Sequence, residues 1–107
     1  MTRRDDERLQ DVLDAIAAIR SHMARGELSD GLIYDAVRVR LIEIGEAVKD
    51  ISEQLLSTEP SIPWSAIARM RDHLAHHYFD TEQAHVSGTV AHDLDPLEQA
   101  VLRIRTI

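Results

Sequence analysis

The segment from 30 to 57, DGLIYDAVRVRLIEIGEAVKDISEQLLS, carries a long and regular pattern of apolar side chains. The gaps between them are 4, 4, 3, 4, 3 and 4 residues, and the pattern consists of Ile33, Val37, Leu41, Ile44, Val48, Ile51 and Leu55. Spacing of three and four residues places side chains on one face of an α-helix. The sequence therefore predicts a single helix over 30–57, capped by Ser29 or Asp30.

A helix of this length would extend over roughly 40 Å, which is longer than a small domain needs to cover its own core. We therefore expect part of its apolar face to meet a second molecule, as in a homodimer. Gly45 lies within this helix, where glycine costs about 1 kcal/mol relative to alanine. Its expected use is to let another helix come close, and a tolerated surface glycine is the alternative.

On the N-terminal side of this segment, the sequence predicts a second amphipathic helix over residues 3–25. Thr2 with Asp5 three residues later is a capping pattern, and the apolar residues behind it keep helical spacing: Leu9, Val12, Leu13, Ile16, Ile19 and Met23. Arg25 followed by Gly26 is a reasonable end for this helix.

The pattern of the C-terminal half predicts further helices, which are separated by prolines and capping residues. Pro63 suits the first position of a helix, and the large aromatic Trp64 is expected in the core. Asp80 is expected to cap the next helix, and Asp95 to cap a last one that has Pro96 at its start. No alternating strand pattern is visible, so the expected fold class is all-α, an antiparallel bundle of four to five helices.

Length and composition limit the remaining possibilities. The 107 residues suit one domain, 1–107, and the chain has no cysteine for a disulfide, a thiolate metal site or a thiol nucleophile. No secretion signal or long apolar run is visible, which predicts a soluble, cytoplasmic protein away from the membrane. The net charge of −7 argues against non-specific binding of nucleic acid.

The segment 64–80, WSAIARMRDHLAHHYFD, concentrates the side chains that can do chemistry. Arg71 is permanently charged, His76 titrates near neutral pH, and Tyr78 carries a phenol. RNA supplies its own nucleophile, the 2′-hydroxyl, so a site that moves a proton and stabilises phosphate charge can cut it without a metal. The hypothesis assigns proton transfer to His76 and charge stabilisation to Arg71.

Helix geometry places a condition on this hypothesis. At about 100° per residue, Arg71 and Tyr78 lie about 20° apart around a regular helix, but Arg71 and His76 lie about 140° apart. They share a face only if the helix loosens near its end or if two chains contribute. A different interpretation uses His73 and His77, which are four residues apart and could chelate a metal ion. We instead expect these two histidines to face solvent or RNA.

Three blocks of the sequence carry a resemblance to a known family: GEAVKDIS at 45–52, IPWSAIARMRDHLAHHYFD at 62–80 and TVAHDLDPL at 89–97. They resemble the HepT-like toxins, a branch of the HEPN (higher eukaryotes and prokaryotes nucleotide-binding) superfamily. The resemblance implies an all-α bundle, a homodimer with its cleft at the subunit interface, and RNA cleavage that requires no metal or other cofactor. Arg71 and His76 match the catalytic motif, with Asp72, His73, His77 and Tyr78 as supporting or phosphate-binding positions.

The resemblance also implies a partner, an antitoxin of the minimal nucleotidyltransferase type that transfers AMP to the motif tyrosine, here Tyr78. Two residues depart from the family pattern, and one of them is Ser87, which stands where a tryptophan is expected early in the helix after Asp80. The other, Asp72, stands where asparagine is often found, and it puts a negative charge beside Arg71. The alternative to a ribonuclease is a helical interaction module that binds a nucleotidyltransferase and cuts no RNA.

Overall fold

The structure is a computed structural model that describes the backbone of residues 1–75 and 79–107 and the side chains of residues 1–75 and 85–107. Within these residues all regular structure is helical, as the sequence predicts. The helices are α1 (Arg3–Met23), α2 (Gly31–Lys49), the one-turn α3 (Glu53–Leu56), α4 (Trp64–Ala75), α5 (Phe79–His92) and α6 (Leu94–Arg105). Among the described helices, none is both long and apolar enough to cross a membrane.

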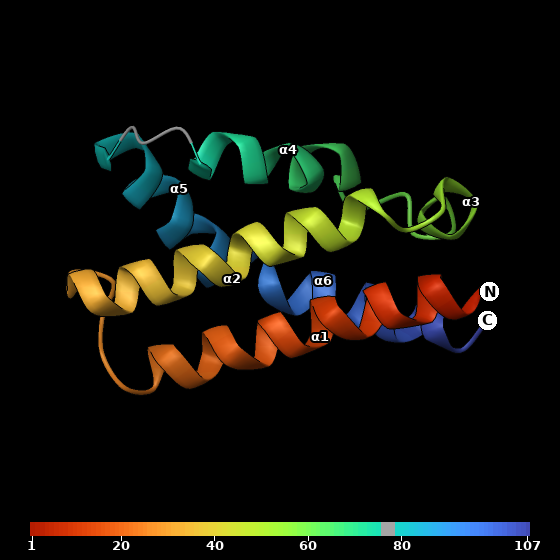
Figure 1. Ribbon diagram of the computed structural model, residues 1–107, viewed down its shortest axis with the longest axis horizontal. Helices are drawn as coiled ribbons and strands as arrows, with labels where there is room; N and C mark the ends of the chain where they lie inside the picture. Colours follow the sequence, from red (N-terminus) through yellow and green to blue (C-terminus); the bar gives the residue numbers. More distant parts are fainter. Residues whose placement is uncertain (76–78) are drawn as a thin grey trace.

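Helix α2 occupies the middle of the bundle. It packs against α1 on one side and α4 on the other, while α6 lies along α1 and packs against α5 (Figure 1). The two chain ends lie together at one end of the molecule (Figure 1), where Arg105 near the C-terminus pairs with Asp6 at 3.2 Å. The central position of α2 explains why its apolar residues are so regularly spaced.

The start of α1 confirms the predicted cap. The Thr2 side chain accepts a hydrogen bond from the backbone N–H of Asp5 at 3.0 Å, and the helix ends at Met23, two residues before the predicted end. Asp30, one of the two caps considered for the second helix, accepts from the backbone N–H of Leu32 at 2.9 Å.

The predicted single helix over 30–57 is wrong, because α2 ends at Lys49 and α3 begins only at Glu53. The carboxylate of Asp5 in α1 accepts a hydrogen bond from the backbone N–H of Ser52 at 2.9 Å. In a continued helix this N–H group would instead donate to a carbonyl of α2. Arg4 makes two hydrogen bonds of 2.7 Å to Asp50 at the same place. Helix α1 thus binds the polar groups of the turn that divides the two helices.

The chain itself buries the whole predicted apolar face. All seven of its residues are at most 9% exposed, and these are Ile33, Val37, Leu41, Ile44, Val48, Ile51 and Leu55. The expectation that part of this face meets another molecule is therefore wrong. The turn after Lys49 folds the last two residues back onto the same core, so the length of the pattern provides no argument for a dimer.

Gly45 confirms the expected close approach of two helices. A Cβ atom built on Gly45 would lie 3.1 Å from the backbone oxygen of Ile67 and 3.1 Å from Cβ of Arg71. Both residues belong to α4, so the backbones of α2 and α4 are nearly in contact here. The contact fixes α4, and with it Arg71, against the most central helix of the fold.

The boundaries of the later helices differ from the predictions by one or more residues. Helix α4 begins at Trp64, one residue after Pro63, and the Trp64 side chain is half-buried against the core with its ring N–H donating to the carbonyl of Glu59 at 3.0 Å. Asp80 lies inside α5 rather than at its cap.

A break between α5 and α6 is confirmed, but Asp95 does not cap the last helix. Asp93 occupies the cap position, and Asp95 instead pairs with Arg20 of α1. Pro96 is the third residue of α6. It is tolerated there because the first N–H groups of a helix have no partner within the helix.

Substitution of Gly45 tests the α2–α4 contact. Gly45→Ala should lower the free energy of unfolding, by about 1 kcal/mol, because crowding of the α4 backbone outweighs the gain in helix propensity. Gly88→Ala in α5 is the matched control, since a Cβ there would meet no atom within 4 Å. It should raise the free energy of unfolding by up to about 1 kcal/mol. Urea denaturation measures both, and a stabilised Gly45→Ala would contradict the crowding argument.

Substitution of Asp5 tests the turn after α2. The backbone N–H of Ser52 is the largest cause that lowers the pKa of Asp5 below its ordinary value of 3.8. A lowered folded-state pKa stabilises the fold above pH 3.8, and this contribution is lost as the pH falls through the folded-state value. Asp5→Ala should therefore cost about 2 kcal/mol at pH 7.

The cost of Asp5→Ala should shrink as the pH falls below 3.8 in urea denaturation curves. Asp6→Ala is the control, because Asp6 is exposed and forms only a surface pair with Arg105. Such pairs contribute about 0–1 kcal/mol. An Asp5→Ala cost that stays constant down to pH 2 would contradict the assignment to the ionised carboxylate.

Candidate functional site

Arg71 lies on α4 where this helix packs closely against Gly45 of α2. Its backbone N–H group and Cβ stand over Gly45, while 44% of its side chain remains exposed. Burial of the stem and exposure of the charged end are typical of an arginine that binds an anion at the surface. The α2–α4 contact therefore fixes the backbone of Arg71 and leaves its guanidinium exposed to solvent.

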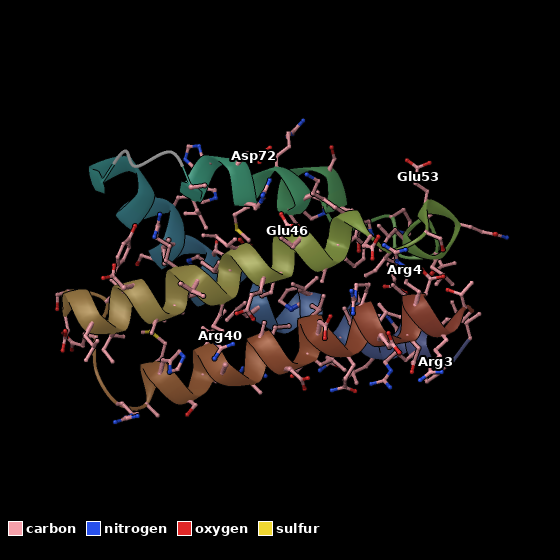
Figure 2. All side chains as sticks on the ribbon, in the orientation of Figure 1. Arg3, Arg4, Arg40, Glu46, Glu53 and Asp72 are labelled. Atoms are coloured by element: carbon pink, nitrogen blue, oxygen red, sulfur yellow. The ribbon has the colours of Figure 1, made fainter. Side chains whose placement is uncertain are left out.

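Two carboxylates pair with the Arg71 guanidinium. Glu46 of α2 contacts Nε, and Asp72 of α4 contacts Nη1 at 3.2 Å. Figure 2 shows Glu46 on α2 facing the underside of α4, on which Asp72 is labelled. Arg71 thus forms an ion pair with the adjacent Asp72, and a second acid is added by α2. The three side chains together carry a charge of −1 instead of the +1 of Arg71 alone.

The last turn of α4 is held by a second residue of α2. The Nε–H of Arg38 donates to the carbonyl oxygen of Leu74 at 3.0 Å, and Leu74 is fully buried. A cation at the C-terminal end of a helix also interacts favourably with the helix dipole. Arg38 and Glu46 therefore hold α4 at two places along the same central helix.

His73 is exposed on α4, as expected, but its described neighbour is an imidazole on another helix. The rings of His73 and His85 of α5 lie with centroids 5.3 Å apart and are tilted by 60°. His77, which the metal interpretation pairs with His73, lies outside the described residues. Within the described part of the chain, no three side chains of the metal-binding types come together.

His76 and Tyr78 also lie outside the described residues, so their distances from Arg71 remain predictions. They follow α4, which is described as far as Ala75, and precede α5, which begins at Phe79. Of the predicted catalytic pair, the described structure thus shows Arg71. It also shows two residues of α2, Arg38 and Glu46, that contact α4.

A cavity of about 260 Å³ lies where α2, α4, α5 and α6 meet. Most of its lining is apolar, including Ile44, Ile67 and Met70, with His85 and Asp93 also contributing. Neither Arg71 nor Glu46 lines it. Because a phosphate needs cationic or N–H donors, this cavity is not where we expect an RNA backbone to bind.

Sequence reasoning missed Glu46, Arg38 and His85 as neighbours of the site. A signal for Glu46 was present, since it directly follows a glycine in a helix interior, where an incoming helix is expected. No comparable signal marked Arg38 or His85. Arg38 contacts Leu74, 36 residues away, and His85 contacts His73 on a different helix.

Comparison with known proteins assigns this chain to a family. The family model described as "Ribonuclease HepT-like" matches residues 9–104. The chain belongs to the HepT-like ribonuclease family. The match extends from the first turns of α1 to the end of α6, and the family is the one that the three sequence blocks resemble.

Two named relatives support this assignment. "Probable ribonuclease HepT" of Thermococcus cleftensis is 32% identical over 98% of this chain and 99% of its own length. "Putative RNase MJ0127" of Methanocaldococcus jannaschii is 39% identical over 68% of this chain, an alignment that spans 58% of that relative. No solved structure matches the chain. HepT-like membership is thus carried by sequence over nearly the whole of the chain.

Proposed function

We propose that this HepT-like protein is an endoribonuclease toxin that cuts RNA without a metal ion, at a site formed in a homodimer. The observation that supports it best is Arg71, held on α4 by contact with α2 yet with an exposed guanidinium, in a chain that matches a ribonuclease family from residue 9 to 104. Arginine offers a planar fork that suits the non-bridging oxygens of a phosphodiester.

In the proposed reaction the 2′-oxygen of RNA attacks the adjacent phosphorus and the bond to the 5′-oxygen breaks. His76 accepts the proton of the 2′-hydroxyl, and a proton must reach the departing 5′-oxygen. Arg71 stabilises the negative charge that accumulates on the phosphorane oxygens. The products would be a 2′,3′-cyclic phosphate and a 5′-hydroxyl. Tyr78 would donate a hydrogen bond to the phosphate or orient it.

The second candidate is a helical interaction module that binds a nucleotidyltransferase and cuts no RNA. It is favoured by the two carboxylates on Arg71 and by the net charge of −7, because both oppose the approach of a polyanion. A phosphate must replace or share these contacts before it can use the arginine. Cleavage assays on purified protein separate the two candidates.

Alanine substitution of the two proposed catalytic residues tests the ribonuclease. Arg71→Ala should lower the cleavage rate by about 10²- to 10³-fold, as expected for loss of a group that stabilises transition-state charge. His76→Ala should lower it by about 10²- to 10⁴-fold. The rate is measured on labelled RNA, with circular dichroism to show that helix content is unchanged.

Two controls accompany these variants. EDTA should leave the wild-type rate unaltered, and loss of cleavage that zinc restores would replace this mechanism by a metal site involving the histidines. Light scattering should give a dimer rather than the 12.1 kDa monomer. A monomer that cuts RNA at full rate would contradict the composite site.

Modification of Tyr78 tests the proposed antitoxin. A nucleotidyltransferase would join the Tyr78 oxygen to the α-phosphorus of ATP and release pyrophosphate, adding about 329 Da and a negative charge near −1 per AMP. The attached phosphate would compete with RNA for Arg71, and the nucleoside would fill the cleft. Mass spectrometry of the protein co-expressed with such a partner should locate AMP on Tyr78 and find none on Tyr78→Phe. An unmodified Tyr78 in a fully inhibited complex would indicate inhibition by binding alone.

A further inference from the structure

Among the side chains that the structure describes, Glu46 is the one acid that reaches Arg71 from another helix. It follows Gly45, the residue over which the backbone of Arg71 sits, and its carboxylate contacts Nε of the guanidinium. Two cations near Glu46 are engaged elsewhere, since Arg40 pairs with Glu43 and Arg8 with Asp11 and Asp50. Within the described residues, Arg71 is therefore the cation with which Glu46 pairs.

We propose that Glu46 is a positioning residue for Arg71: it holds the Nε–H so that the far end of the guanidinium is presented to the RNA phosphate. The proposal rests on the proposed ribonuclease function and assigns one residue beyond it. Gly45 contributes to this positioning, because a side chain there would push Arg71 away from Glu46.

The geometry of arginine explains why holding Nε is effective. A free arginine side chain has about 2 kcal/mol of rotamer entropy, and a bond at Nε restricts every torsion of the stem before the planar group. The closest contact of Glu46 is with Nε, and that of Asp72 is with Nη1. Nη2 carries two N–H groups that can point to a phosphate.

The rigidity of the support distinguishes Glu46 from Asp72. Glu46 lies on the central helix α2, between Ile44 at 1% and Val48 at 2% exposure, so its backbone is held by the core. Asp72 is adjacent to Arg71 on α4, and successive side chains of a helix diverge by about 100°. Asp72 therefore adds negative charge without bracing Arg71 against a second element.

A competing role for Glu46 predicts the opposite result. If the carboxylate only neutralises Arg71, its removal should strengthen RNA binding and raise the cleavage rate. If it positions Arg71, its removal should lower kcat although the protein becomes less acidic. The sign of the change in kcat therefore decides between positioning and neutralisation.

The experiment compares Glu46→Ala, Glu46→Gln and the matched control Glu43→Ala. Glu43 lies on the same helix, is also exposed and pairs with Arg40 at 3.1 Å, so its removal changes the net charge equally without touching Arg71. Glu46→Ala should lower kcat by about tenfold to a hundredfold, the scale of a small misplacement of a reacting group. KM should change little.

The conservative variant separates positioning from simple loss of stability. Glu46→Gln keeps an oxygen that accepts from Nε and should retain kcat within about threefold of wild type, as should Glu43→Ala. An unchanged or raised kcat in Glu46→Ala overturns the proposal. A Glu46→Gln variant as slow as Glu46→Ala, with its Nε contact intact, also overturns it.

A measurement that needs no cleavage keeps this proposal distinct from the proposed function. NMR of the ¹⁵N-labelled protein reports the exchange of the Arg71 Nε–H with water, which should quicken by about tenfold in Glu46→Ala and stay slow in Glu46→Gln. If wild type and Arg71→Ala both fail to cut RNA, the ribonuclease is wrong. If the Nε–H exchanges equally fast in wild type and Glu46→Ala, the positioning role is wrong.

Discussion

The close approach of α2 and α4 at Gly45 is the constraint on which the arrangement of this protein depends. At Gly45 the α4 backbone comes so near that a methyl group would lie 3.1 Å from a carbonyl oxygen of α4. A bulkier residue would separate the helices and move α4 outward. Because α4 carries Arg71, the position of this arginine in the predicted site follows from this one contact.

The same contact determines the electrostatics around Arg71. Bringing α4 onto Gly45 also brings Arg71 onto the next residue of α2, an acid, so the cation is braced and partly neutralised at once. An acidic protein that must bind RNA benefits from a cation whose direction is fixed, since it cannot rely on a broad positive surface. The cost is competition between carboxylates and phosphate at Arg71, and the AMP that we propose on Tyr78 would add a second phosphate to this competition.

The HepT-like family assignment and the geometry support each other at different levels. The match over residues 9–104 establishes the family, while the described structure shows how this chain holds the motif arginine. Arg38 and Glu46 reach α4 from the same helix. They suggest that α2 acts as the support for catalysis and that α4 carries the groups that would meet the substrate.

The sequence by itself determined the helical class, the cap at Thr2, a choice of two caps for the second helix, the purpose of Gly45 and the identity of the motif. These depend on local backbone preferences and on side-chain spacing, which neighbouring residues in the chain control. The sequence also placed the negative charge of Asp72 beside Arg71, since the two are adjacent.

Only the tertiary structure decided where the apolar pattern of 30–57 is interrupted and what braces Arg71. Helical spacing continues through Ile51 and Leu55, so the pattern contains no sign of a turn. The break depends on Asp5, 47 residues before Ser52, and the brace depends on Glu46, which a different helix supplies. Spacing along the chain indicates which side chains lie on the same face of a helix. It does not indicate which distant polar group contacts them, because the packing of the helices determines that contact.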